Sequence, residues 1–282
     1  MPYILLLLSL SLAQFPLSAQ AGSARIAVAS NFAPTIKKLA AVYQANSGHQ
    51  IQLAFGSTGK HYAQIHHGAP FDAFFAADIR RAQLLEKEGR VISRSRFTYA
   101  IGQLVLWSTD PSMIKNDAIL DRDAFRHLAM ANPKLAPYGQ AAEEFLLASG
   151  RRERLNARLV FAENITQAYQ FVASGNAELG FVAWSQLKRP GQAITGSWWP
   201  IPQNTYTPIE QQAVLLKNNP AARGFLEFVQ GSRGRAIIAS FGYLLPDAGS
   251  SLGESIDSIS IEQVRLKSYL QPIQARENKH AQ

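Results

Sequence analysis

The stretch AFGSTGKHYAQIHHGAPFDAFFAAD, residues 54–78, holds a small polar cluster between segments of different hydrophobic period. Residues 50–56 alternate apolar and polar side chains as a strand does, and residues 60–67 have the spacing of a short helix. Residues 71–78 are apolar and aromatic, which indicates a buried strand. The cluster Gly56–Gly59 therefore lies at a strand-to-helix junction. Its hydroxyls and glycines could serve as a turn, a nucleophile or a seat for an anion.

Strand-like and helix-like segments alternate along the chain around this stretch. Strands are expected at residues 24–30, 50–56, 71–78, 127–133, 159–164 and 178–187. Helices are expected at residues 32–47, 60–67, 79–89, 138–150, 165–177 and within 221–243. This pattern predicts an α/β fold of mostly parallel sheets flanked by helices. It occurs twice, and the apolar segments 97–108 and 208–217 are expected to carry the chain between the two halves.

The composition favours a folded protein with a basic but diffuse surface charge. The chain has 282 residues, of which 47% are hydrophobic, enough for a sizeable core. It has no cysteine, which excludes disulfides, thiolate metal sites and a lipid-anchoring cysteine. The net charge of +8 comes from cations that are scattered rather than interleaved with aromatic residues. This argues against nucleic-acid binding, although the positive surface could steer anions.

Both ends of the chain differ from this alternating core. Residues 1–21 are expected to be a secretory signal peptide, with an apolar run at 4–12 and small residues suited to cleavage near Ala21, although the first residues lack Lys and Arg. No later segment is long and apolar enough to span a membrane. Residues 247–282 are polar, with one amphipathic segment around 261–270, and are expected to form an extension outside the core.

Four strand-to-helix junctions carry small hydrogen-bonding residues. They are residues 29–32, 56–59, 136–139 and 163–166. The first turn of a helix has unpaired N–H groups and a positive dipole end, so such junctions can bind an anion without any charged side chain. In parallel α/β sheets these junctions gather beyond the carboxyl ends of the strands. Each junction taken alone is better explained as an ordinary N-cap, and it is the occurrence of four such junctions that favours an anion site.

Other site chemistries have weaker support in the sequence. The cluster Gly56–Gly59 lacks the G-x-S-x-G pattern of a hydrolase elbow and the upstream glycine of a P-loop. The three nearby histidines lack metal-ligand spacing, and Asp72 and Asp78 are expected to be caps or surface residues. Trp198 and Trp199 could stack on a ligand, but packing against a wall between lobes or in a surface groove is the plainer interpretation.

Specific stretches of this chain resemble the periplasmic molybdate-binding proteins of ABC transporters. The matching stretches run in family order from about Ala24 to Pro246. The most specific is GSTGKHYAQIHHGAPFDAFFAAD, with a hydroxyl pair followed by Gln-Ile, Gly-Ala-Pro and a strand that ends in Ala-Asp. The resemblance implies a two-lobed Venus-flytrap fold (type II), with residues 22–100 and 210–246 in one lobe and 101–209 in the other. It further implies a periplasmic protein, expected to be a monomer, that delivers molybdate or tungstate to a membrane permease without catalysis or a cofactor.

The resemblance also implies which residues hold the oxyanion. Ser30 and Asn31 match the first junction, and Thr58 matches the hydroxyl of the second, with Ser57 as its neighbour. The backbone N–H groups of Tyr138 and Ile165 match the third and fourth junctions. No metal ligand is implied apart from these contacts to the oxyanion.

Two departures from the family pattern and three alternatives stay open at this point. Many members carry a tyrosine donor where this chain has Ala183, but the subgroup with Asn31 and Tyr138 also lacks it. Thr58 replaces the usual serine and adds a methyl group. The alternatives are a binding protein for another oxyanion such as sulfate, a secreted hydrolase using Ser30 or Ser57, and a nucleic-acid binder.

Overall fold

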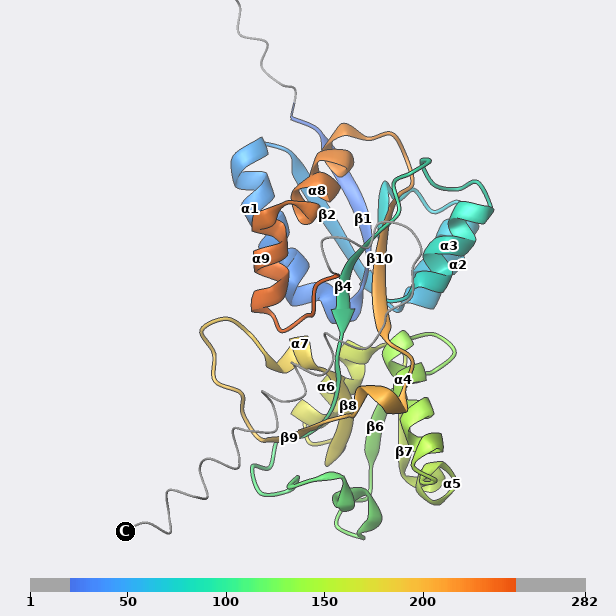
Figure 1. Ribbon diagram of the computed structural model, residues 1–282, viewed down its shortest axis with the longest axis vertical. Helices are drawn as coiled ribbons and strands as arrows, with labels where there is room; N and C mark the ends of the chain where they lie inside the picture. The colour runs from blue at the N-terminus through green and yellow to red at the C-terminus, as the bar shows by residue number, and fades with distance from the viewer. Residues whose placement is uncertain (1–20, 247–282) are drawn as a thin grey trace, which may run out of the picture. The chain divides into compact units, whose positions relative to one another are not determined.

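The computed structural model describes residues 21–246 of the 282-residue chain. The expected signal peptide, apart from Ala21, lies outside the described residues, as do the expected C-terminal extension and its amphipathic segment. Among the described helices, none combines the length and the hydropathy that a membrane span requires. The described residues form two five-stranded sheets, each with its own hydrophobic core (Figure 1).

The first lobe is built on a sheet with the strand order β2-β1-β3-β10-β4. Its strands are β1 (Ser23–Ala29), β2 (Gln50–Gly56), β3 (Ala73–Ala76), β4 (Phe97–Gly102) and β10 (Ile209–Leu215). Strand β1 pairs in parallel with β2 and β3, whereas β10 runs antiparallel to β3 and β4. The parallel part places the carboxyl ends of β1, β2 and β3 at one edge, from which the first two helical junctions leave.

Helices cover both faces of the first sheet. They are η1 (Ser30–Phe32), α1 (Ala33–Ser47), α2 (Thr58–His66), α3 (Ile79–Lys87), α8 (Pro220–Gln230) and α9 (Ser232–Ser240). Helices α1, α8 and α9 lie on one face and α2 and α3 on the other (Figure 1). Aromatic residues fill the interface between the sheet and helices α1, α8 and α9, where the ring of Phe32 contacts those of Tyr99 and Tyr243. Asp78 caps α3 by accepting a bond from the backbone N–H of Arg81, so its expected role as a cap is confirmed.

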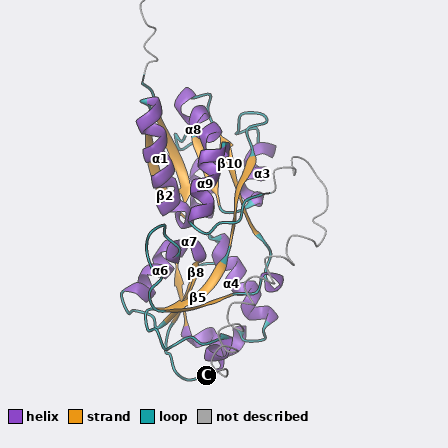
Figure 2. Cartoon of the chain, turned by 60° about the vertical axis from the view of Figure 1, so that its left-hand side comes forward, coloured by secondary structure: helices purple, strands orange, loops and turns teal. Residues whose placement is uncertain are grey.

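The second lobe has the strand order β7-β6-β8-β5-β9, and Figure 2 shows both sheets flanked by helices. Its strands are β5 (Leu104–Ser108), β6 (Leu128–Ala131), β7 (Leu159–Ala162), β8 (Leu179–Ala183) and β9 (Ser197–Pro200). Its helices are α4 (Pro137–Ala148), α5 (Arg152–Leu155), α6 (Ile165–Ala173) and α7 (Trp184–Leu187), with short turns η2 (Asp117–Asp121), η3 (Asn156–Arg158) and η4 (Gln203–Thr205). The parallel strands β6, β7 and β8 deliver the N-termini of α4 and α6 to the edge that meets the first lobe.

Both sheets are mostly parallel, as the sequence pattern predicted, although each contains one reversed strand. Strand β10 runs antiparallel to β3 and β4 in the first sheet, and β5 runs antiparallel to β8 and β9 in the second. Each is the first strand that the chain forms after it crosses between the lobes. The segment 97–108, expected to be one strand, is two strands in different sheets, separated at Gln103. The strand expected at 178–187 ends at Ala183, where α7 begins, and β9 contains the Trp198 and Trp199 pair, which had no strand prediction.

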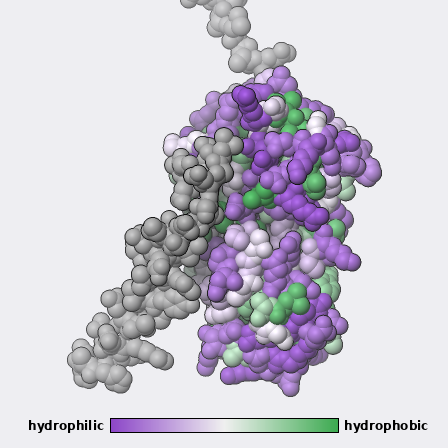
Figure 3. All heavy atoms as spheres, turned by 45° about the vertical axis from the view of Figure 1, so that its right-hand side comes forward, coloured by the Kyte–Doolittle hydropathy of each residue, from purple (hydrophilic) through white to green (hydrophobic). Residues whose placement is uncertain are grey.

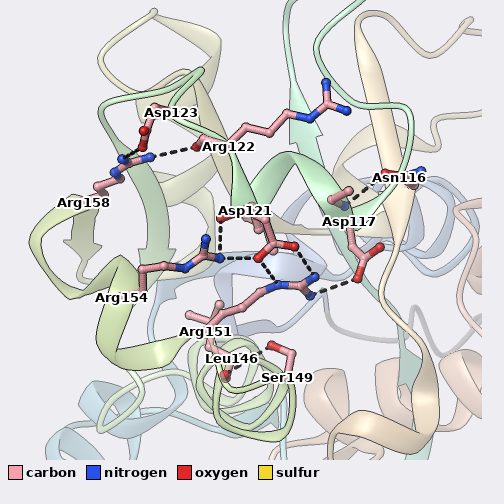
Figure 4. A network of polar contacts seen from close by, with 12 residues as sticks. Asn116, Asp117, Asp121, Arg122, Asp123, Leu146, Ser149, Arg151, Arg154 and Arg158 are labelled. Atoms are coloured by element: carbon pink, nitrogen blue, oxygen red, sulfur yellow. Dashed lines mark hydrogen bonds and ion pairs between the residues drawn. The ribbon is translucent and has the colours of Figure 1, made fainter.

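A cluster of ion pairs lies in the second lobe. In the second lobe, arginines at 151, 154 and 158 hold the η2 segment through ion pairs with aspartates at 117, 121 and 123 (Figure 4). The Arg151 and Arg154 guanidinium groups lower the pKa of Asp121 to about 2. The face in Figure 3 is mostly hydrophilic, with small separate hydrophobic areas.

Candidate oxyanion site

A small cavity lies where the junctions of the two lobes meet. Its volume is about 10 Å³, roughly the space that the centre of one water-sized sphere needs. It is lined by Ala29, Ser30, Asn31, Thr58, Ala77, Ala136, Pro137, Tyr138, Asn164 and Ile165. Five of the six residues expected from the sequence are therefore brought together. The sixth, Ser57, does not line the cavity and instead caps α2, accepting a bond from the Lys60 N–H at 3.4 Å.

Helix N-termini from both lobes surround this cavity. Ser30 begins η1, Thr58 begins α2 and Ile165 begins α6. Tyr138 is the second residue of α4, after Pro137, which cannot donate a backbone hydrogen bond. N–H groups in a first turn have no partner within their own helix, and the helix dipole makes this end positive. The arrangement thus offers convergent backbone donors to a negatively charged group.

The Thr58 hydroxyl has one defined partner in the first lobe. Its Oγ1 accepts a hydrogen bond of 3.1 Å from the backbone N–H of Ala77, at the end of β3. A hydroxyl has one donor hydrogen besides its acceptor lone pairs, so this bond leaves the Thr58 hydrogen available to a ligand. The side chain is 1% exposed, and its orientation is fixed before any ligand arrives.

Asn164 is a cavity residue that the sequence reasoning missed. Its Oδ1 accepts bonds from the N–H groups of Thr166 and Gln167, which caps α6, and also from the Ser30 hydroxyl at 3.1 Å. The same first turn makes a second contact with Ser30, since the Thr166 hydroxyl donates a hydrogen bond to the Ser30 carbonyl at 3.0 Å. The N-cap pattern was visible in the sequence, but the contact with Ser30 joins residues 134 positions apart.

The side-chain N–H groups of Asn31 are used within the protein and are not available to bind an anion. Its Nδ2 donates to Gln211 Oε1 at 2.8 Å and to the Tyr243 hydroxyl at 3.0 Å. An amide nitrogen has two hydrogens, so both are used in this buried network. The backbone N–H of Asn31, in the first turn of η1, is the donor that this residue still has for a ligand.

Among the described residues that line the cavity, none has a charged side chain. Its one titratable group is the Tyr138 phenol, whose pKa burial raises well above the ordinary value. Two residues after Thr58, the Lys60 ammonium lies 2.6 Å from the Glu163 carboxylate and pairs with it. Arg81 forms an ion pair with Asp78 and donates to the Lys134 carbonyl in the other lobe at 3.0 Å. The cavity is therefore lined by uncharged hydrogen-bond donors.

Direct contacts between the lobes show that this structure is a closed form. The Gly59 N–H donates to the Leu135 carbonyl at 2.9 Å. A Cβ at Gly59 would lie 3.0 Å from the same oxygen, so the absence of a side chain permits this close approach. Together with the Ser30–Asn164 and Lys60–Glu163 contacts, this bond joins the two lobes.

Comparisons with known proteins agree with this architecture. The family model described as bacterial extracellular solute-binding protein matches residues 24–244. The chain belongs to this family. Over 230 residues it is 46% identical to the molybdate-binding protein ModA of Azotobacter vinelandii, covering 80% of this chain and 91% of the relative. It is 42% identical over 232 residues to ModA of Rhodobacter capsulatus, covering 81% and 90%. The resemblance to molybdate-binding proteins drawn from the sequence motifs is confirmed.

Solved structures also share the two-lobed fold of this solute-binding protein. The periplasmic molybdate-binding protein of Azotobacter vinelandii superposes with a TM-score of 0.77 and 41% identity, over 79% of this chain and 99% of that one. The sulfate-binding protein SubI of Mycobacterium tuberculosis superposes with a TM-score of 0.64 over 80% and 88%, but its identity is 14%. The second similarity therefore concerns the fold alone.

The alternative chemistries find little support in the geometry of this solute-binding protein. The Ser30 hydroxyl donates to an amide oxygen and Ser57 caps a helix, so neither is hydrogen-bonded to a histidine that could act as a base. His61 is buried with its Nδ1 at 3.1 Å from Gln64, and His66 pairs with Glu88. Across residues 21–246, no group of three or more His, Asp or Glu side chains is arranged to hold a metal ion.

Proposed function

We propose that this solute-binding protein captures molybdate as a tetrahedral dianion between its lobes and delivers it to the permease of an ABC transporter. The observation that carries the proposal is the meeting of Ser30, Asn31, Thr58, Tyr138 and Ile165 at one cavity lined without charged side chains. The identity of 46% and 42% to molybdate-binding proteins supports the same ligand. In this role the protein acts in the periplasm and catalyses no reaction.

The donor set suits an ion that must be held tightly and then released. Hydroxyl and backbone N–H groups at four helix starts spread the two negative charges over several hydrogen bonds. Two lobes allow entry in an open form and burial of the ion on closure, as hinge motions do in other binding proteins. Opening on the permease would return the donors to water, and no buried countercharge would remain to hold the ion back.

Tungstate and sulfate are the relevant competitors because both are tetrahedral dianions. The same donors would bind tungstate, which we include in the proposed ligand class. Sulfate is the second candidate, and the shared fold with a sulfate-binding protein keeps it under consideration. Because charge and shape are equal, discrimination would depend on how closely the closed lobes fit the ion. Molybdate is favoured here by the identity to the molybdate-binding relatives.

Isothermal titration of the full chain with molybdate, tungstate, sulfate and phosphate tests this proposal. We expect one site per chain for molybdate and tungstate, with sulfate at least about a hundredfold weaker, a difference of about 3 kcal/mol. Thermal unfolding should shift upward in proportion to the binding free energy. Clear binding of sulfate without binding of molybdate or tungstate would contradict the proposal that molybdate is the ligand. Hydrolysis of a generic ester with a Ser30-dependent rate would instead favour an enzyme.

A further inference from the structure

A buried cluster of hydroxyl and amide side chains joins the two lobes behind the cavity. The first lobe contributes Asn31, Tyr99, Gln211 and Tyr243, and the second contributes Tyr138 and Ser185. All six are buried, and Gln211 is 0% exposed. Gln211 lies on β10, the strand that brings the chain back to the first lobe, so the cluster sits beside the hinge.

Contacts in the first lobe fix the orientation of the Gln211 amide. Its Oε1 accepts from Asn31 Nδ2 at 2.8 Å and lies 3.0 Å from the Tyr99 hydroxyl, whose single hydrogen is shared with the Ala76 carbonyl at 3.2 Å. The Nε2 is left facing the second lobe, where it donates to the Tyr138 hydroxyl at 3.3 Å. The first lobe thus presents a preoriented donor to a phenol of the other lobe.

The space around Gly102 is independent evidence that the first lobe is shaped to receive the Tyr138 phenol. We call the space at Gly102 and Gln211 the seat of this phenol. A Cβ at Gly102 would lie 2.1 Å from the Tyr138 hydroxyl oxygen and 2.8 Å from Tyr138 Cζ. It would also lie 2.8 Å from Nε2 of Gln211, the end of a side chain. The φ angle of Gly102 is outside the left-handed region, so its backbone would accept alanine. The closest obstacle to a side chain here is therefore a residue of the opposite lobe.

We propose that the Tyr138 side chain is a closure contact and that Gly102 and Gln211 form its seat. The inference rests on the proposed function, because closing the lobes is what encloses the oxyanion. The seat and the phenol belong to different lobes, so their hydrogen bond exists in the closed form and is broken on opening. Gly102 and Gln211 are positioning residues. They act through Tyr138 and hold the α4 N-terminus, with its N–H, at the cavity.

The contact stabilises the closed state without touching the ion, so it should slow release more than it speeds capture. Tyr138→Phe removes the hydroxyl and leaves the backbone donor of that residue in place. Gly102→Ala fills the seat. We expect each variant to release molybdate about 5- to 10-fold faster, with an association rate within about twofold of wild type. The double variant should lose less than the product of the two single effects, because both act on one contact.

A similar glycine and tyrosine pair within the first lobe supplies matched controls. The Tyr43 hydroxyl donates to the Ala221 carbonyl at 3.2 Å, and a Cβ at Gly224 would lie 2.6 Å from that hydroxyl. Tyr43→Phe and Gly224→Ala therefore make the same chemical changes at a contact that does not depend on closure. These controls should lower the melting temperature of the ligand-free protein and leave the rate of molybdate release unchanged.

Stopped-flow binding and displacement of molybdate, with small-angle X-ray scattering to follow compaction, separate the outcomes. Faster release and reduced compaction in the Tyr138 and Gly102 variants, but not in the controls, support the closure contact. Wild-type release rates in those variants, or equal acceleration in the controls, overturn it while the proposed function stands. Failure of the wild-type chain to bind molybdate, tungstate or sulfate overturns the proposed function and the closure contact together.

Discussion

The Lys60 ammonium lies 2.6 Å from the Glu163 carboxylate, and this ion pair joins the two lobes at the rim of the cavity. Lys60 stands two residues after Thr58, and Glu163 stands two residues before Ile165. The two side chains are 50% and 42% exposed, so water screens the pair and its contribution to closure is small. Its position matters more for the approach of an anion, since opening the lobes separates a positive from a negative charge.

Neutralising either partner should change ion release in the same direction and ion capture in opposite directions. Lys60→Gln and Glu163→Gln should each speed molybdate release by up to about fivefold, because an exposed pair contributes at most about 1 kcal/mol. Lys60→Gln should slow association by removing an attractive charge, whereas Glu163→Gln should speed it. Stopped-flow rates at low and high salt check this, and the association effects should shrink at high salt. Lys87→Gln, at an exposed position on α3, makes the same charge change and should leave release unchanged. An equal fall in association for both lysine variants would mean that net charge alone steers the ion.

Loss of the Thr58 hydroxyl should weaken binding strongly, because it is oriented by the Ala77 N–H and retains a hydrogen for the ligand. Thr58→Ala is expected to reduce molybdate affinity by about 1–3 kcal/mol, or roughly 5- to 150-fold. It should also lower the melting temperature, because the Ala77 N–H loses its acceptor. Thr58→Ser keeps the hydroxyl and should stay within about threefold of wild type. Titration calorimetry of wild type and the two variants checks this order of affinities. A wild-type affinity in Thr58→Ala would show that the hydroxyl does not bind the ligand.

The residues of the junctions could be foreseen because each belongs to a local strand-to-helix pattern. Tyr138 and Ile165 stand at the starts of helices that the hydrophobic period predicts, whereas Thr58 begins α2 two residues before the helix expected at 60–67 and was identified through the family resemblance. Their meeting at one cavity follows from parallel strands, whose carboxyl ends share an edge. Ser57 shows the limit of this reasoning, since a hydroxyl next to a site residue can be a plain helix cap.

The closure contacts have no comparable signal in the sequence. Gly102 and Gln211 sit in strands where nothing in the local pattern marks them, and their importance comes from Tyr138 in another lobe. Asn164 could be expected as a cap but not as a partner of Ser30. The mostly parallel sheets were predicted, but the reversed strands β10 and β5 were not, because strand direction at the crossings depends on how the two lobes are joined.

Molybdate affinity should be nearly independent of pH where the ligand remains a dianion. Within the described lining of the cavity, Tyr138 is the one side chain that can titrate, and burial raises its pKa well above the ordinary value of about 10. The phenol therefore stays neutral between pH 6.5 and about 9. Titrations across this range should give dissociation constants within about twofold of one another. A transition inside it would mean that a charged group outside the lining governs binding.

The stability of the ligand-free protein should fall as the solution is acidified, because burial of His61 disfavours the protonated, charged form of its imidazole. The residue is 4% exposed, and its ring lies edge-on to Phe71. Burial lowers the pKa of His61 below the unfolded value of about 6.5.

The sign of this effect follows from proton binding. Below about pH 6.5 the unfolded chain takes up a proton at His61 that the folded protein resists, so stability present above that pH is lost as pH falls. Melting temperatures at pH 7.5 and 5.5, above the range where most carboxylates titrate, should show a larger drop for wild type than for His61→Gln. His67→Gln removes an exposed imidazole and should keep the wild-type drop. An undiminished drop in His61→Gln would assign the acid sensitivity to other groups.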